Sequence, residues 1–170
     1  MGYFFQVKNQ LSDDTCTQLI GQLEASQNEL VALLHSITAF PDWQPAPDMW
    51  SFRYHAAHLA TVEEEAFWER VTQIAAGKGP FFEYYWNTGR DFSQLDLSDS
   101  LETWIATRRR ILEFVRVLPE TGLELTGTHA TFGPITVLDV LQIMLTHDRE
   151  HLAELQQMVV TLSFKDHLAR

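Results

Sequence analysis

The sequence predicts an all-α protein that folds as a four-helix bundle, in one domain that spans residues 1–170. Four long segments repeat apolar residues with the three- and four-residue spacing of an amphipathic helix, and no stretch of comparable strength alternates with the two-residue period of a strand. Of the 170 residues, 45% are hydrophobic and 21% are charged, which is the composition of a globular protein with a full core. Ligand sites in such bundles usually lie between facing helices.

The first predicted helix runs from about Asp14 to Ile37, and Asp13 or Asp14 is available to cap its start. Its apolar side chains recur at helical spacing, at Leu19, Leu23, Leu30, Leu33 and Ile37. A linker with three prolines, at 41, 45 and 47, then separates it from the second helix.

The second predicted helix begins near Trp50 and Ser51, with Ser51 as its N-cap, and continues to about Ala76. The helix-breaking run 77–80 ends it, and its apolar positions include Leu59, Val62, Ala66 and Ile74. A connection of about twenty residues follows, which is longer than most structureless loops in compact domains. Five aromatic residues lie close together in it, Phe81, Phe82, Tyr84, Tyr85 and Trp86. We therefore expect this long, aromatic-rich connection to be functional, partly structured, or both.

The third predicted helix opens with the capping-box pattern Asp99-x-x-Glu102 and closes before Pro119. Apolar residues define its buried side, at Leu101, Trp104, Ile105, Ile111, Leu112, Val115 and Leu118. The basic run Arg108-Arg109-Arg110 falls within this helix, where a solvated face is the expected location.

Residues 120–135 mix glycine, proline and threonine and fit either a loop or a short hairpin, so no regular structure is assigned to them. Thr136, with Asp139 three positions on, opens the fourth predicted helix. This helix continues through Leu141, Met144, Leu155, Met158 and Leu162.

The composition excludes several classes of function. Twelve basic residues against twenty-three acidic ones give a net charge of -11, which repels nucleic acid and anionic lipid alike. No apolar run is long enough to span a bilayer, and the first residues fit neither a secretion signal nor a myristoylation site, so a cytoplasmic protein is expected. A single cysteine, Cys16, leaves no basis for a disulfide framework or a thiolate metal cluster.

Two histidines in the fourth helix, His147 and His151, are four residues apart and point within about 40° of each other. They share a stripe with Val140, Met144 and Met158, which is expected to face the bundle interior. The chain has seven histidines, so this spacing alone fits ordinary core or surface histidines as well as metal ligands. A third histidine, His58, lies midway along the second helix, and three imidazoles from two packed helices can bind one ion while leaving positions open.

These motifs resemble the DinB/YfiT-like family of metalloenzymes. The resemblance rests on Trp50-Ser51, His58-Leu59 and Glu63 to Glu65 in the second helix, and on His147-Asp148-x-x-His151-Leu152 in the fourth. It implies up-down-down-up connectivity, a homodimer, and a divalent metal ion held by His58, His147 and His151. Zinc or nickel is the expected ion, with iron or manganese as further candidates, because three imidazoles suit several metals. Glu154 stands where the family often has glutamine.

Other polar residues compete for roles at the site. His55 lies one turn before His58 and could be a fourth ligand or could orient a ligand, although a surface or hydrogen-bonded histidine is the more common case. His129 is expected in a loop. Glu150 and Glu154 are weak candidates for a catalytic base, at about 60° and 20° from His147 around the helix.

Two other metal chemistries fit poorly. His147-x-x-Glu150-His151 matches the H-x-x-E-H pattern of inverted zinc peptidases, but that site needs a third acidic ligand well downstream, and few residues remain. A carboxylate-bridged di-iron site needs Glu-x-x-His pairs, and the sequence contains none.

The sequence thus predicts a divalent-metal-dependent enzyme with a three-histidine site and a small-molecule substrate. The family resemblance implies an S-transferase or isomerase that uses a low-molecular-weight thiol. A metal-dependent hydrolase and a non-catalytic metal-binding bundle are the alternatives.

Overall fold

Four long helical segments form the bulk of the computed structural model, which describes the backbone of residues 2–87 and 89–168 and the side chains of 14–87 and 89–164. The first helix is α1 (Gly2–Ser36). The second is a continuous rod in which α2 (Phe52–Val62) passes through a π-helical turn, η1 (Glu63–Phe67), into α3 (Trp68–Ala75). The third and fourth are α4 (Leu97–Arg116) and α6 (Val137–Leu168).

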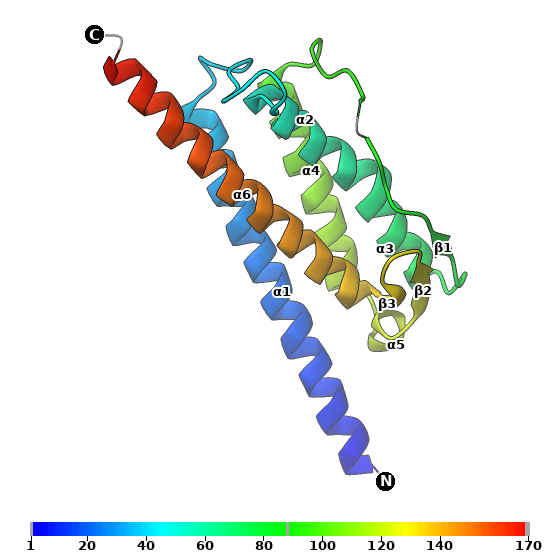
Figure 1. The fold of residues 1–170 in the computed structure, drawn as a ribbon. Coiled ribbons are helices and arrows are strands. Elements are labelled where there is room, and N and C mark those ends of the chain that lie inside the picture. The colour runs from blue at the N-terminus through cyan, green and yellow to red at the C-terminus, as the bar shows by residue number, and fades with distance from the viewer. Residues whose placement is uncertain (1, 88, 169–170) are drawn as a thin grey trace.

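The four segments run up, down, down and up, as Figure 1 shows. Helices α1 and α6 lie side by side and point the same way, while the α2–α3 rod and α4 point the opposite way. Because α3 ends at the opposite end of the bundle from the start of α4, residues 76–96 run back along its length. This arrangement confirms the predicted all-α four-helix bundle and its connectivity.

The helix starts are partly as predicted. Ser51 caps α2, because its side chain accepts a hydrogen bond from the Tyr54 backbone N–H at 3.2 Å. Thr136 and Asp139 form a reciprocal cap, each backbone N–H donating to the other side chain at 2.8 and 3.2 Å.

Two predicted starts were wrong. Helix α4 is capped by Asp96 rather than Asp99, and Leu97, in its first turn, is buried in the core. Helix α1 begins at Gly2 rather than near Asp14. No proline and no further glycine interrupts the chain between these two positions, and a residue that can cap a helix does not by itself stop one.

A small sheet covers one end of the bundle beside the short helix α5 (Glu120–Leu123). Strands β2 (Thr126–His129) and β3 (Gly133–Thr136) form an antiparallel hairpin, which is one of the two predicted alternatives for this segment. Strand β1 (Phe81–Phe82), from the aromatic connection, pairs parallel to β2 and was not predicted. Gly127 is required in β2, since a Cβ there would lie 3.0 Å from the Phe82 ring and 3.1 Å from the Ile74 side chain.

The core consists of two apolar clusters with a polar layer between them. One cluster gathers around Leu30, Phe52, Trp104 and Leu155, and the other around Leu23, Val71, Ile111 and Leu141. On each helix the residues between the two clusters include buried polar side chains, among them Ser26, Gln27, Glu63, Arg108 and Asp148. The bundle is therefore tied together at mid-height by polar contacts.

Arg108 is the centre of this layer, and its side chain is 1% exposed, so the predicted solvated location was wrong. Its guanidinium forms a two-pronged ion pair with Glu63 and another with Asp148, the latter at 2.9 and 3.0 Å. We call these three residues, together with Ser26 and Trp104, the Arg108 cluster. Ser26 donates to Asp148 at 2.6 Å, and the Trp104 indole N–H donates to Glu63 at 3.1 Å.

The sequence did contain a signal for the buried arginine. Arg108 stands three and four residues from Ile111 and Trp104, in line with the apolar stripe of the helix. Asp148 occupies the same kind of position between Met144 and His151.

Over the described part of the chain, no helix has the length and apolar character needed to cross a membrane.

Candidate metal centre

The structure brings together the three histidines that the sequence singled out, His58 from α2 and His147 and His151 from α6. The Nε2 atom of His147 lies 3.1 Å from that of His58 and 3.0 Å from that of His151. The buried face of each helix carries these rings, since the histidines continue the apolar stripes that pack α2 and α6 into the bundle.

The separations of the His147 Nε2 from the other two nitrogens fit a metal ion. An ion about 2.1 Å from each imidazole nitrogen requires the nitrogens to be separated by about 3.0 to 3.4 Å. If His147 carries its proton on Nε2, it can donate that proton to one neighbouring Nε2, so three neutral imidazoles leave at least one lone pair without a full hydrogen bond. A cation would use all three lone pairs, so the donor set could hold a divalent ion.

Asn87, from the aromatic-rich connection, fixes the orientation of His58. The Nδ1–H of His58 donates to the Asn87 side-chain oxygen at 2.9 Å, which leaves the lone pair on Nε2 facing the other two histidines. Asn87 is itself buried, and its Nδ2 has no hydrogen-bond partner among the described residues. A buried donor without a partner carries a desolvation cost.

His55 lies behind His151 rather than among the three converging nitrogens. Its Nδ1 is 3.0 Å from the Nδ1 of His151. If His151 uses Nε2 for an ion, its proton is on Nδ1 and is donated to His55, so His55 would orient a ligand rather than be one. We call His55, His58, His147 and His151 the histidine cluster.

Trp50 covers the histidine cluster from the side of the linker. Its ring stacks on that of His151 with centroids 5.9 Å apart and tilts over His58 at 4.8 Å. On the other side, the Phe67 ring meets His147 edge-on at 5.9 Å. These aromatic rings limit the contact of the imidazoles with water.

Burial, together with the neighbouring His58, lowers the pKa of His55 and of His147 to about 4 each. The pKa values of His58 and His151 are also lowered, with burial as the largest cause. All four imidazoles are therefore uncharged at neutral pH, which is the form that binds a metal ion.

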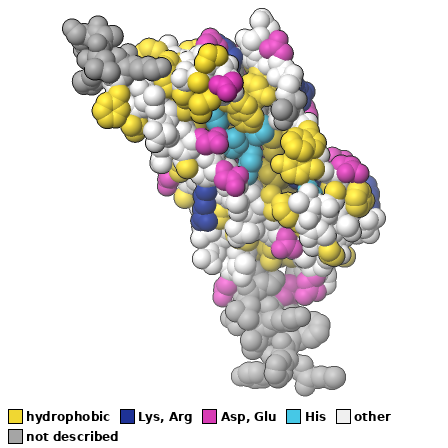
Figure 2. Space-filling view, in the orientation of Figure 1, with side chains coloured by type: hydrophobic (Ala, Val, Ile, Leu, Met, Phe, Trp, Pro, Cys, Tyr) yellow, Lys and Arg dark blue, Asp and Glu magenta, His cyan; other side chains and the backbone are white. Residues whose placement is uncertain are grey.

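The three converging histidines form part of the wall of a pocket of about 570 Å³. Figure 2 shows histidine side chains at the surface in the middle of this face, among hydrophobic side chains and with acidic groups close by. Glu150 and His129 line the same pocket, and His129 lies in strand β2 rather than in the predicted loop. Glu154 lines a different pocket, on the far side of His151.

A second group of possible ligands overlaps the first. His55, His151 and Glu154 bring ligand atoms within 4.8 Å of one another, but the Glu154 carboxylate is exposed and 3.9 Å from His151 Nδ1. A neutral His151 has one lone pair and so serves one of the two groups at a time. The group with His58 is favoured because its donors are closer together and Asn87 holds one of them in place.

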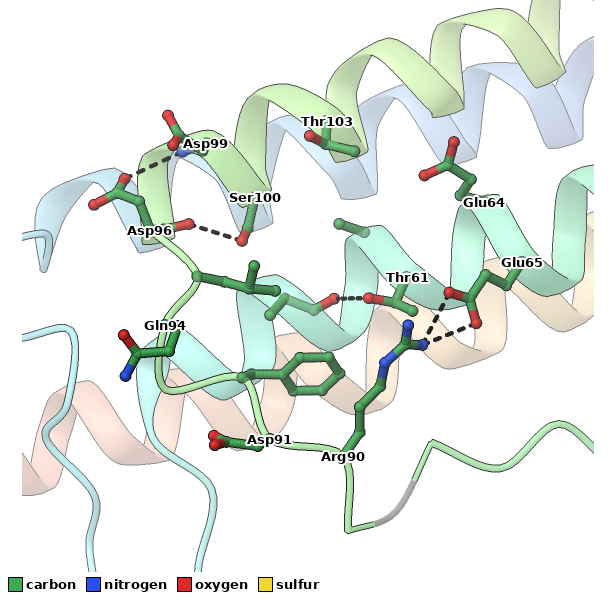
Figure 3. A pocket seen from close by; sticks show the side chains of 14 residues that line it. Thr61, Glu64, Glu65, Arg90, Asp91, Gln94, Asp96, Asp99, Ser100 and Thr103 are labelled. Atoms are coloured by element: carbon green, nitrogen blue, oxygen red, sulfur yellow. Dashed lines mark hydrogen bonds and ion pairs between the residues drawn. The ribbon is translucent and has the colours of Figure 1, made fainter.

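Another pocket, of about 540 Å³, lies between α2, α4 and residues 90–96 and is drawn in Figure 3. Several acidic side chains surround it, but many of the charges are already engaged. Arg90 donates to both oxygens of Glu65 at 2.9 Å, and Asp96 caps α4. No three-residue metal group occurs here among the described residues, which makes the pocket beside the histidines the candidate site.

Three residues at the site were not predicted from the sequence as functional: Asn87, Arg70 and, as a cover over the imidazoles, Trp50. Asn87 lies 29 positions after His58 in an irregular segment, where no periodicity points to it. Arg70 stands one position before the buried Val71. It lines the pocket because β1 and β2 pack beside it, and the sequence pattern did not predict that contact.

Comparison with known proteins agrees with this fold. Residues 22–155 match the family model of the DinB superfamily. YfiT from Bacillus subtilis, described as a probable metal-dependent hydrolase with an unusual four-helix bundle topology, superposes with a TM-score of 0.75 at 19% identity, covering 87% of each chain. A DinB-like protein from the same organism, YjoA, superposes with a TM-score of 0.57 at 19% identity, covering 86% of this chain and 92% of its own.

No curated protein sequence is similar enough to count as a match. The family model spans most of the bundle, including all three converging histidines, and the solved structures share its helical arrangement. The chain therefore belongs to the DinB superfamily.

Proposed function

We propose that this protein is a divalent-metal-dependent enzyme that acts on a small molecule, with His58, His147 and His151 as the metal ligands. The observation that carries the proposal is that the His147 Nε2 lies 3.1 Å from that of His58 and 3.0 Å from that of His151, on the wall of a pocket. Catalytic metal sites typically have three protein ligands and an open position, whereas structural sites are closed by four. The description of YfiT as a probable metal-dependent hydrolase supports the same class of function.

A divalent ion held by these histidines would act as a Lewis acid, lowering the pKa of a coordinated water or thiol toward neutrality. The surrounding residues have separate tasks. Asn87 holds the His58 ring with its Nε2 toward the site, and with an ion on its Nε2 His151 would donate a hydrogen bond from Nδ1–H to His55. Trp50 and Phe67 keep water from the backs of the imidazoles.

Glu150 is the favoured candidate for the group that takes up a proton from the nucleophile. It comes three positions after His147 and lines the same pocket, whereas Glu154 lines a different one. Both remain candidates, but the location of Glu150 supports it over Glu154.

The identity of the nucleophile separates two versions of the proposal. Water would make the protein a hydrolase, the activity named for YfiT. A low-molecular-weight thiol would make it an S-transferase or isomerase, as the family resemblance implies. The pocket of about 570 Å³ is large enough for either version. Homodimer formation and a cytoplasmic location remain predictions of the sequence.

The test is elemental analysis of tag-free wild type beside His58→Ala and His147→Ala, with His35→Ala, an exposed histidine on α1, as the matched control. We expect one divalent ion per wild-type and control chain and none in the two site variants. Turnover is then measured on ester, amide and electrophile panels with and without added small thiols. Metal content unchanged by both site substitutions would refute the proposal.

Dependence of turnover on an added thiol would select the transferase version, and turnover without thiol would select the hydrolase. The Glu150→Gln and Glu154→Gln variants compare the two candidate bases. We expect Glu150→Gln to lower kcat by about 10²-fold or more with metal content unchanged, and Glu154→Gln to change it far less. Equal effects of the two substitutions would contradict the assignment of Glu150.

A further inference from the structure

Arg70, on α3, is a buried cation in the pocket beside the histidines. It is 7% exposed and lines the same pocket as His58 and His147. One phenylalanine ring separates it from the imidazoles, since its Cζ lies 6.0 Å from the centroid of the Phe67 ring and that ring contacts His147. A molecule in the pocket can therefore reach both the histidines and Arg70.

The guanidinium lacks the partner that a buried charge normally has. Four other arginines each form an ion pair with a carboxylate: Arg53, Arg90, Arg108 and Arg116. No described carboxylate lies within ion-pair distance of Arg70, whose one side-chain hydrogen bond goes to the Glu83 backbone oxygen at 3.2 Å. Aromatic rings of Phe67 and Phe82 flank it, at 6.0 and 5.9 Å.

Arginine cannot shed its proton to escape this environment, so the charge remains in the pocket. Burial disfavours the charged form and lowers the pKa of Arg70, and the opposing influence of exposed Glu69 and of Tyr84 is smaller. A buried cation without an anion is costly unless a ligand supplies the counter-charge. In a chain with a net charge of -11, such a cation distinguishes this pocket from the acidic surface around it.

We infer that Arg70 binds a carboxylate group of the substrate, at the end of the molecule away from the reacting bond. A planar guanidinium pairs with a carboxylate through two parallel hydrogen bonds, and a single negative charge balances its single positive one. His129 is a second donor nearby, because its Nδ1 accepts from the Thr131 N–H at 3.1 Å and its proton is then on Nε2.

The remaining walls indicate the rest of the substrate. Tyr84, Trp86 and Phe132 line the pocket with large exposed rings, Trp86 being 74% exposed. Exposed aromatic side chains gathered at one pocket are typical of a surface that packs against an apolar ligand. The substrate class is thus a small carboxylic acid with an apolar or aromatic body. This inference rests on the proposed function only in taking this pocket as the substrate site.

The test compares 3-phenylpropionate with its uncharged amide and with 2-phenylethylphosphonate, by titration calorimetry and tryptophan fluorescence. Each probe is titrated into metal-free and zinc-loaded protein. We expect the carboxylate to bind about tenfold or more tightly than the amide in both forms, since hydrogen bonds to a charged group are worth more than neutral ones. We expect the carboxylate to bind more tightly than the phosphonate as well.

Arg70→Met should abolish this preference while leaving amide binding and metal content at wild-type values. Arg109→Met, which changes an exposed arginine on α4, is the control and should keep the preference. Arg70→Lys keeps the charge but not the two parallel hydrogen bonds, so it should retain only part of the preference. In ¹⁵N-arginine-labelled wild type, the Arg70 Nε–H resonance should shift with the carboxylate and not with the amide, a measurement that does not depend on how the variants fold.

Equal binding of carboxylate and amide by the wild type would overturn the inference, as would a preference that survives Arg70→Met. A preference that His147→Ala removes and Arg70→Met does not would mean that the carboxylate binds at the histidines, which also overturns it. A preference seen in the metal-free protein would stand even if no metal is found, so the two proposals can fail separately.

Discussion

The histidine cluster and the Arg108 cluster are neighbours, because His147 and Asp148 are consecutive on α6, yet their polar groups are satisfied in opposite ways. In the Arg108 cluster, one cation meets two carboxylates, with Ser26 and Trp104 as further donors. In the histidine cluster, three uncharged rings turn nitrogen atoms toward one another at 3.0 and 3.1 Å. The charged groups of the Arg108 cluster all have partners within the chain. The histidine cluster keeps at least one nitrogen lone pair without a full hydrogen bond.

This difference separates structure from function. A buried ion pair whose hydrogen bonds are all made holds helices in register, and the loss of one partner leaves a buried charge without its counter-charge. Burial raises the pKa of Glu63, while Arg108 opposes that shift, so the carboxylate and the guanidinium depend on each other. For the histidines, in contrast, the proposed partner is a metal ion from outside the chain.

The largest expected effect comes from breaking the Arg108 cluster. Arg108→Met leaves Glu63 and Asp148 buried without a cation and should lower the free energy of unfolding by about 3 to 5 kcal/mol. Urea denaturation measures this, with exposed Arg109→Met as the control, which should stay within about 0.5 kcal/mol of wild type. Similar losses in the two variants would mean that the buried network does not stabilise the bundle.

Metal removal should act on the other cluster alone. Zinc at about 100 times its dissociation constant should raise the free energy of unfolding of the wild type by about 2.7 kcal/mol, and a chelator should remove the gain. His147→Ala should show neither response. An Arg108→Met protein that still folds should keep the gain, and its loss there would show that the two clusters are coupled.

The contact between Asn87 and His58 allows a smaller and sharper test. Asn87→Leu removes the acceptor of the His58 proton and should weaken metal binding by about 10- to 100-fold. Asn87→Asp keeps an acceptor at the same place, so metal binding should stay close to that of wild type. Competition titration with a chromophoric chelator compares the three proteins. Equal weakening by both substitutions would indicate a packing effect instead of ligand orientation.

The smallest effect is expected in the pocket of Figure 3, where the ion pair of Arg90 and Glu65 is exposed. Arg90→Met should cost less than about 1 kcal/mol of unfolding free energy, because water and salt screen surface pairs. Metal content should not change. A loss as large as that of Arg108→Met would contradict the contrast between the buried and the exposed ion pairs.

Sequence periodicity was enough for the bundle and for part of the site. The four helical segments, the caps at Ser51 and at Thr136 with Asp139, and the pairing of His147 with His151 all follow from spacing within one helix. His58 was singled out by its place midway along a second amphipathic helix, the family resemblance implied that all three histidines are ligands, and the structure brings the three rings together. The prediction that Arg108 is exposed to solvent was wrong. It rested on the charge of the side chain, whereas the position of Arg108 on the apolar stripe of its helix indicates burial.

The sequence by itself determined which faces of the helices are buried, since burial follows a repeat that can be counted along the chain. Only the tertiary structure decided which polar groups meet. Asn87 reaches His58 from an irregular segment. Arg70 enters the pocket after the π-helical turn at Glu63–Phe67, which adds a residue to one turn and so rotates α3 relative to α2. Contacts between residues far apart in sequence depend on helix rotation and crossing, which no local pattern records.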